Sequence, residues 1–371
     1  MGSIEEAKPP VIGEYMLPII TPSTSNGDPW QRNYFAPPQH LDLVKRKYPL
    51  IDLRPILSQP DYTPESLLKS HGFGIVHHTS NFLSRLNQDS EETIPEEALA
   101  TEYYPEIEEL VLQTTGAKKI FILASALRQG KSIPTEYISP TGLGKVSDAT
   151  SATGKHKLSS QKKLALAAPV RKPHMDFTPL GARQEIRSKS QEIFDAARES
   201  GVIEYEDQIC EASKLEAATK DADDRIRRQY NTNGKLGPRY AAYSIWRPLK
   251  PVQRDPLTLS PRPQEDKSEP GPDGVYWPYE NRIPGYKGDY LKEYAMLGTK
   301  TREQQEGDQM KWYYVPKQRP EEVLFIKLFD SASLGEGSEH ASAPWHASPE
   351  IGSVEGEEPR ESIDVRVLAF W

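Results

Sequence analysis

Short apolar stretches separated by polar, proline-containing segments dominate the second half of the chain. Residues 118–127 (KKIFILASAL) are rich in β-branched and aromatic side chains, which is typical of a buried strand. Comparable segments occur at 239–249, 311–315, 322–330 and 361–371. We therefore expect a β-barrel or sandwich flanked by helices, because strands with a few inserted helices form that architecture.

Helical periodicity is strongest in the first two thirds of the chain. Thr63, followed by PESLLKSH and a glycine, predicts a capped helix that runs into a strand. Residues 95–116 have a helical pattern that is interrupted at Pro105. Residues 182–199 and 207–230 predict two amphipathic, highly charged helices.

The first 60 residues differ from the rest in pattern. They contain many prolines and short extended pieces, so we expect residues 1–60 to be an extension packed on the core. Residues 61–371 then form a single domain. Within it, residues 128–172 are rich in Ser, Thr, Gly and Lys and have no periodicity, which predicts one long loop.

Composition excludes several functional classes. The net charge of −8 argues against nucleic acid, whose binding depends on clustered positive charge. No apolar run approaches the ~20 residues that span a bilayer, so no membrane partner is expected. The start of the chain, MGSIEEAKPP, is not the basic-then-apolar pattern of a signal peptide. A cytoplasmic location is the expectation.

The chain has one cysteine, Cys210. A disulfide framework within the chain is therefore impossible, which fits a reducing compartment. Thiolate zinc sites and iron–sulfur clusters are excluded for the same reason. Cys210 also lies in a polar helical pattern, which disfavours a nucleophilic role.

The segment RKPHMDFTP carries the first candidate chemistry. On an extended segment, residues i and i+2 point to the same side, so His174 and Asp176 can bind one ion. Two imidazoles and one carboxylate on one face are typical of non-haem iron(II) oxygenases. The pair is not unique, because His40 and Asp42 have the same spacing. That second pair lies in the proline-rich extension and has no matching downstream residues.

A third ligand and an anion site are expected nearer the C-terminus. His346 precedes the run Arg360-Glu361-Ser362, in which Arg360 and Ser362 share one face of the last predicted strand. A guanidinium can donate two parallel hydrogen bonds to the distal carboxylate of a 2-oxo acid, and a serine can add a third. His340 is an alternative third ligand, but His346 is favoured because it lies nearer the arginine.

Three segments of the chain resemble a known family. They are SIWRPLKPVQRDPL (244–257), KWYYVPKQRPEEVLFIKLFDS (311–331) and PRESIDVRVLAFW (359–371). They resemble the fungal gibberellin-desaturase-like, or AsaB-like, hydroxylases and desaturases, which are relatives of the CmcJ proteins and depend on iron(II) and 2-oxoglutarate. The resemblance covers roughly residues 70–371. It implies a mainly β fold with flanking helices around a double-stranded β-helix, a jelly-roll or cupin-like core.

The resemblance also implies a function. The metal ligands would be His174, Asp176 and His346, and 2-oxoglutarate would be held near Arg360 and Ser362. With O2 as the oxidant, the enzyme would hydroxylate or desaturate a secondary metabolite such as a terpenoid or meroterpenoid.

This sequence departs from the family pattern at two positions. Trp345 stands between Pro344 and His346, where related proteins commonly have proline followed directly by histidine. Ser244 stands two residues before Trp246, where asparagine is common.

Aromatic residues near these motifs are candidates for substrate binding. Phe177 follows a predicted ligand and could form a wall of the substrate site. Trp246 lies on one face of the strand RYAAYSIWR, and Tyr243 and Arg247 lie on the other. Each aromatic side chain could equally be part of the core.

Two alternative functions remain open at this stage. The altered surroundings of His346 allow a non-catalytic or weakly active subunit that supports a homologous dioxygenase, as a homodimer or heterodimer. The chain could also be a metal-dependent hydrolase or a simple β-barrel binding protein.

Overall fold

The structure is a computed structural model that describes most of the chain. The described residues are 9–20, 42–85, 94, 96–128, 169–211, 213–232, 235–262, 274–282, 291–304, 310–335, 337–352 and 356–371. The long loop predicted at 128–172 lies outside them from 129 to 168.

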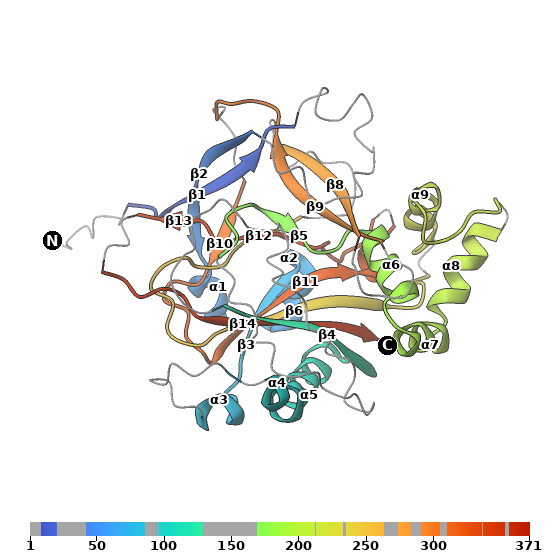
Figure 1. The fold of residues 1–371 in the computed structure, drawn as a ribbon, viewed down its shortest axis with the longest axis horizontal. Helices are drawn as coiled ribbons and strands as arrows, with labels where there is room; N and C mark the ends of the chain where they lie inside the picture. Colours follow the sequence, from blue (N-terminus) through green and yellow to red (C-terminus); the bar gives the residue numbers. More distant parts are fainter. Residues whose placement is uncertain are drawn as a thin grey trace.

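Two β-sheets form the core of the molecule (Figure 1). The larger sheet has nine strands in the order β13-β1-β2-β10-β7-β12-β5-β9-β8. Its strands are β1 (Ile12–Pro18), β2 (Leu43–Asp52), β5 (His174–Met175), β7 (Thr258–Ser260), β8 (Gly274–Arg282), β9 (Leu291–Thr299), β10 (Trp312–Tyr314), β12 (Trp345–Ala347) and β13 (Glu350–Ile351). The smaller sheet has five strands in the order β3-β11-β6-β14-β4. They are β3 (Phe73–His77), β4 (Lys119–Arg128), β6 (Tyr240–Pro248), β11 (Glu322–Asp330) and β14 (Ser362–Phe370).

The five-stranded sheet is buried on both faces. Successive side chains of β6 and β14 point to opposite faces, because the side-chain period of a strand is two. Tyr240 and Phe370 are cross-strand partners on one face, and they belong to the same apolar cluster as Tyr313 and Leu259 of the nine-stranded sheet. The opposite face packs against residues of α5 (Tyr104–Thr115) and of the π-helix before it (Leu99–Tyr103).

The nine-stranded sheet curls on itself. A parallel bridge joins Ile19, just after β1, to Thr299 at the end of β9. The enclosed side contains a second aromatic cluster in which Tyr15 and Trp312 have ring centroids 4.4 Å apart. Trp345 belongs to this cluster, so its side chain points away from the space between the sheets. Residues 12–18 and 43–52 are thus part of the sheet, because β1 and β2 pair with each other and with β13 and β10.

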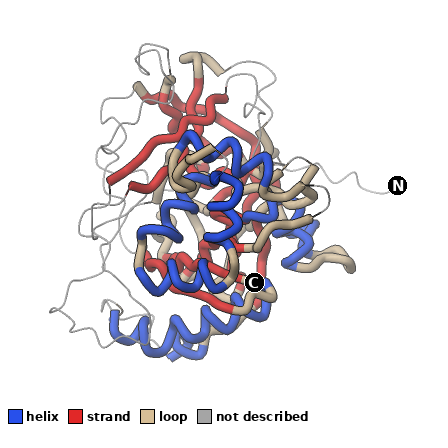
Figure 2. The backbone as a smooth tube through the Cα atoms, turned by 90° about the vertical axis from the view of Figure 1, so that its right-hand side faces the viewer, coloured by secondary structure: helices blue, strands red, loops and turns tan. Residues whose placement is uncertain are grey.

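A group of helices covers one end of the two sheets, on the side that faces the viewer in Figure 2. The sequence predicted two helices here, and this prediction was wrong. The four helices are α6 (Pro179–Ser188), α7 (Gln191–Glu199), α8 (Val202–Glu211) and α9 (Lys220–Gln229). The first expected helix is divided because the Ser190 side chain accepts a hydrogen bond from the Ile193 amide and starts a new helix. A helical hydrophobic period does not record such a cap.

The remaining helices lie outside this group. The predicted capped helix is confirmed as α2 (Pro64–His71), in which Thr63 and Ser66 form a capping box and Gly72 ends the helix at φ 81°. Pro105 lies in the first turn of α5, as its missing N–H allows. The others are α1 (Arg54–Leu57), α3 (Asn81–Arg85), α4 (Glu96–Ala98) and a 3-10 turn (Ser331–Ser333). No helix in the described ranges has the length and apolar character needed to cross a membrane.

Gly181 allows α6 to lie directly against the backbone of β9. A Cβ atom added at Gly181 would be 2.0 Å from the Glu293 carbonyl oxygen, whereas one at Gly116 would meet nothing within 4 Å. We predict that Gly181→Ala lowers the free energy of unfolding by about 3 kcal/mol, because the helix must move off the strand. Gly116→Ala, which strains only a positive φ, should lower it by about 1 kcal/mol. Urea denaturation of both variants checks this, and equal losses would contradict it.

Candidate metal centre

Two imidazoles and a carboxylate converge in the space between the sheets. His174 on β5 and His346 on β12 are direct partners in the antiparallel register. Their ring centroids are 4.3 Å apart. Asp176 follows β5, and one ligand atom from each residue lies within 4.8 Å of the others. All three side chains are buried. Within the described ranges, this is the one group of three or more such residues that could hold a metal ion.

The ring nitrogens and the carboxylate are oriented for a cation. His174 Nδ1 is 2.8 Å from the Lys172 carbonyl oxygen, so Nδ1 carries the proton and Nε2 is left with its lone pair. His174 Nε2 lies 3.8 Å from Asp176 Oδ1, and His346 Nε2 lies 4.0 Å from Oδ2. Oδ1 has no hydrogen-bond partner among the described residues. A buried, unpartnered carboxylate oxygen beside two imidazole nitrogens fits a divalent transition metal.

The electrostatics of the three groups favour their metal-binding forms. Burial, reinforced by the neighbouring His346, lowers the pKa of His174 to about 3. Burial also lowers the pKa of His346. Burial raises the pKa of Asp176, but the Arg366 guanidinium and the two imidazoles outweigh it and bring that pKa down to about 2. At neutral pH the site therefore offers two neutral imidazoles and one ionised carboxylate.

A pocket adjoins these three residues, and both apolar and polar side chains line it. The apolar lining consists of Val170, Trp246, Leu257, Ile326 and Ala347. Beyond the histidines and Asp176, the polar lining consists of Arg128, Ser244, Ser348, Arg360, Asp364 and Arg366. Three buried arginines beside two buried aspartates leave an excess of positive charge, which suits an anionic ligand.

Arg360 has hydrogen-bonding capacity that the protein does not use. Its Nη1 donates to the Asp255 carbonyl oxygen at 2.8 Å and to Ser348 Oγ. Its Nε and the buried Ser362 Oγ have no hydrogen-bond partner among the described residues. Burial, followed by the charge of Arg128, lowers the pKa of Arg360 to about 9. Unused donors in a cation-rich pocket fit a carboxylate, which would restore both hydrogen bonds and charge balance.

A strained residue supports Arg360. Asp255 has φ 55°, which is uncommon for a residue with a side chain. Its backbone carbonyl faces Arg360, and its carboxylate oxygen Oδ1 lies 2.6 Å from Arg171 Nη2. Asp255, in the segment RDPL (254–257), therefore orients the guanidinium of Arg360 in the pocket.

His340, the alternative third ligand, lies elsewhere. It follows the 3-10 turn after β11, and its Nδ1 is 3.9 Å from Asp330. Trp345 does not displace His346, because consecutive strand residues point to opposite faces of the sheet. His40, which formed the competing sequence pair, lies outside the described residues.

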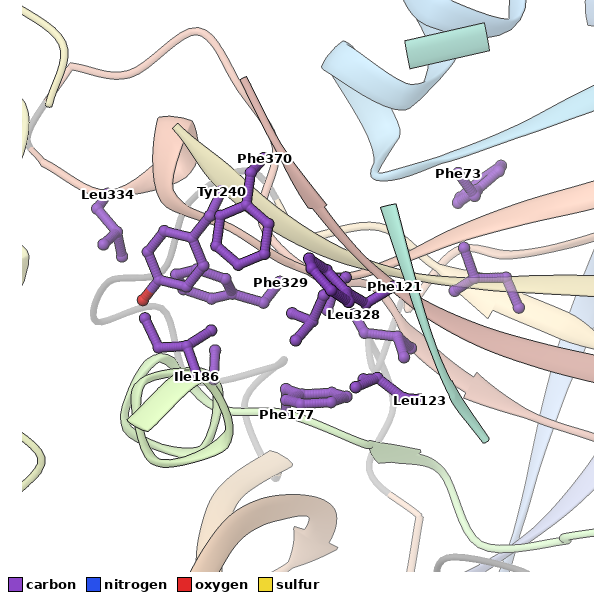
Figure 3. Close-up of a cluster of buried hydrophobic side chains, with 14 of the residues drawn as sticks. Phe73, Phe121, Leu123, Phe177, Ile186, Tyr240, Leu328, Phe329, Leu334 and Phe370 are labelled. Atoms are coloured by element: carbon purple, nitrogen blue, oxygen red, sulfur yellow. The ribbon is translucent and has the colours of Figure 1, made fainter. Parts of the chain in front are cut away.

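Three of the four predicted substrate-binding residues do not line the pocket. Tyr243 and Arg247 lie on the far face of β6, where Arg247 donates to the Tyr103 hydroxyl at 3.1 Å and to the His78 carbonyl at 2.8 Å. Phe177 packs in the core with Phe121, Leu123 and other apolar side chains (Figure 3). Trp246 does line the pocket. The alternation of β6 separated the two faces correctly, but it did not tell which face pointed inward.

Sequence reasoning missed Arg128, Asp364 and Arg366. Ser362, Asp364 and Arg366 alternate along β14 and share one face of the strand, and Arg360 precedes Ser362 by two residues, just before the strand begins. Of these four residues, Arg360, Asp364 and Arg366 line the pocket. That spacing was available from the sequence. Arg128 had no such signal, because it enters through the pairing of β4 with β14, in which it lies opposite Ser362.

Comparison with known proteins connects this site to named enzymes. Residues 32–203 and 215–370 match a family model described as an Oxidoreductase/YMDC permease-like domain. The chain is similar to the Gibberellin cluster GA4 desaturase of Gibberella fujikuroi, at 34% identity over 89% of this chain and 88% of that protein. It is also similar to the alpha-ketoglutarate-dependent dioxygenase tstK of Talaromyces stipitatus, at 24% identity over 98% and 97% of the two chains.

A solved structure confirms the fold. The iron and alpha-ketoglutarate-dependent endoperoxidase NvfI superposes with a TM-score of 0.54 at 20% identity, covering 98% of this chain and 99% of that one. Together with the two curled sheets, this likeness confirms the predicted mainly β fold with a jelly-roll core.

The pKa shifts predict acid sensitivity of the metal-free protein. The folded-state pKa of His174, about 3, lies below its ordinary value of 6.5, so the folded chain binds fewer protons between these pH values. Stability should therefore fall by a few kcal/mol as the pH decreases through this window, since one pKa unit corresponds to about 1.4 kcal/mol. Denaturation in a chelator at several pH values measures the slope. His174→Gln should flatten it, and an unchanged slope in that variant would contradict the assignment.

Proposed function

This chain belongs to the family of fungal hydroxylases and desaturases that includes the Gibberellin cluster GA4 desaturase, and we propose that His174, Asp176 and His346 are its iron ligands. It is an iron(II)- and 2-oxoglutarate-dependent oxidoreductase that uses O2. The observation that carries the ligand assignment is the buried convergence of the three side chains, with Asp176 Oδ1 lacking a hydrogen-bond partner among the described residues and lying 3.8 Å from His174 Nε2.

The residues of the chain have distinct tasks in this proposal. Iron(II) with 2-oxoglutarate and O2 supplies the oxidising power that removes hydrogen from a substrate. The two neutral imidazoles and the ionised Asp176 would hold the metal beside the pocket that they line. Arg360 Nε and Ser362 Oγ receive the distal carboxylate of 2-oxoglutarate. Burial of all these groups excludes water and strengthens their interactions.

The substrate is a small secondary metabolite, which we propose to be a terpenoid or meroterpenoid that is hydroxylated or desaturated. The apolar part of the pocket, including Trp246 and Ile326, offers a hydrocarbon skeleton surfaces to pack against. A relative named as a GA4 desaturase acts in the same class of chemistry. The cytoplasmic location and a homodimer or heterodimer remain predictions.

The alternative functions lose their support. A supporting, non-catalytic subunit was suggested by the tryptophan next to His346, but Trp345 points away from the site and leaves His346 in the group of three. The hypotheses of a metal-dependent hydrolase and of a simple binding protein are not supported, because the chain belongs to a family of oxidoreductases.

The two candidate third ligands can be separated by paired variants. We predict that His346→Ala abolishes tight iron(II) binding and turnover, because only two ligands remain. His340→Ala is the matched control and should retain both, since His340 lies beside Asp330 and outside the group. Iron content and anaerobic iron(II) titration provide the measurement. If iron were retained in His346→Ala but lost in His340→Ala, His340 and not His346 would be the third ligand.

The carboxylate site can be tested with variants at three consecutive residues, 360 to 362. Arg360→Lys should raise the KM for 2-oxoglutarate about 10- to 100-fold, because a charged hydrogen bond contributes about 1.5–3 kcal/mol. Ser362→Ala should raise it by a smaller factor. Glu361→Gln is the control, since Glu361 points outward and pairs with Lys250 at 3.2 Å. An unchanged KM in Arg360→Lys, or an equal rise in Glu361→Gln, would refute the site.

The binding step has its own readout. Adding 2-oxoglutarate to the anaerobic iron(II) protein should produce a charge-transfer absorption band, and Arg360→Lys should need a higher 2-oxoglutarate concentration to reach half its intensity. A full-strength band at the wild-type concentration would show that another residue binds the carboxylate.

A further inference from the structure

Asp176 is held by a second group that lies outside the ligand set. Arg366 on β14 places its Nη2 3.1 Å from Asp176 Oδ2. Both side chains are buried, with 7% and 2% of their surfaces exposed. The contact crosses the space between the sheets, because Arg366 belongs to the five-stranded sheet and Asp176 follows β5 of the nine-stranded sheet.

Arg366 is itself held by a chain of polar contacts. Asp364, on the same face of β14, has its Oδ2 3.6 Å from Arg366 Nε. Ser244 on β6 donates to Asp364 Oδ1, and Ser244 is also the direct partner of Arg366 in the β6–β14 register. Ser244 is therefore the far end of a chain of contacts that runs through Asp364 and Arg366 to Asp176.

The geometry distinguishes the two oxygens of Asp176. Oδ2 interacts with the guanidinium, whereas Oδ1 has no hydrogen-bond partner among the described residues. A carboxylate whose second oxygen is held in this way has a fixed rotation about its Cβ–Cγ bond. Partners of this kind typically change metal affinity 10- to 100-fold when removed. Arg366 lies within ion-pair distance of Asp176, so its direct contact with the proposed ligands includes that carboxylate.

We propose that Arg366, oriented by Asp364 and Ser244, is a positioning residue that binds one oxygen of Asp176 and presents the other to the metal. This inference rests on the proposed metal ligands. It adds a role for three residues of two strands that the sequence did not assign to the site. It also gives the buried ion pair a function in metal binding, where a purely structural pair would contribute only to the stability of the fold.

The proposal is tested by metal binding to the full-length protein without any substrate. Arg366→Gln should weaken the Kd for Co(II) and for anaerobic iron(II) about 10- to 100-fold. It should also change the visible absorption of the Co(II) protein, because Asp176 is free to bind through both oxygens. Arg366→Lys keeps the charge and should recover part of the affinity. Asp364→Asn should give an intermediate loss, and it keeps the test informative if Arg366→Gln does not fold.

Arg239→Gln is the matched control. Arg239 pairs with the buried Asp330 at 3.0 Å, and neither residue lines the pocket. This variant should lose stability without changing the Kd or the Co(II) spectrum. Arg366→Gln with a wild-type Kd and spectrum would overturn the inference, as would an equal loss of affinity in Arg239→Gln. Absence of metal binding in the wild-type protein would instead overturn the proposed ligands, so the two failures are distinguishable.

Discussion

The antiparallel pairing of β5 with β12 is the constraint on which the site depends. This register sets His174 directly opposite His346 and places both on the side of the sheet that faces the five-stranded sheet. A slip of either strand by one residue would turn its imidazole to the other face, where Met175 and Trp345 now pack among aromatic side chains. Those apolar neighbours hold the register, because burying a histidine in their place would be unfavourable.

The charges between the sheets follow from the same arrangement. The imidazoles belong to the nine-stranded sheet, and Asp176 follows its strand β5. Asp364 and Arg366 belong to the five-stranded sheet, and Arg360 lies just before its strand β14. Buried arginines are unfavourable without anionic partners, so arginines beside the proposed metal ligands are expected to pair with carboxylates of the protein or of a bound ligand. Arg366 has Asp176, while the unused donors near Arg360 fit the carboxylate of 2-oxoglutarate. Under the proposed function, the metal and the cosubstrate would therefore share one pocket.

Much of the fold was readable because it depends on local signals. The strands at β4, β6, β11 and β14 and the capped helix α2 were predicted from apolar content and end residues. The division of the charged helices depends on the Ser190 cap, which the helical period does not reveal. The curl that joins β1 to β9 depends on contacts between residues far apart in the sequence, so no local pattern could indicate it.

The sequence by itself determined which residue types were available and which of them share a strand face. It indicated His174 with Asp176 and Arg360 with Ser362 as candidates, because side-chain direction repeats every two residues along a strand. It favoured His346 over His340 because His346 lies nearer Arg360 in the sequence. Only the tertiary structure decided which face points into the pocket, so it placed Trp246 in the lining and Tyr243 and Arg247 outside it. It alone brought in Arg128 and set Arg366 against Asp176, because these contacts arise from pairing between strands and from the approach of two sheets.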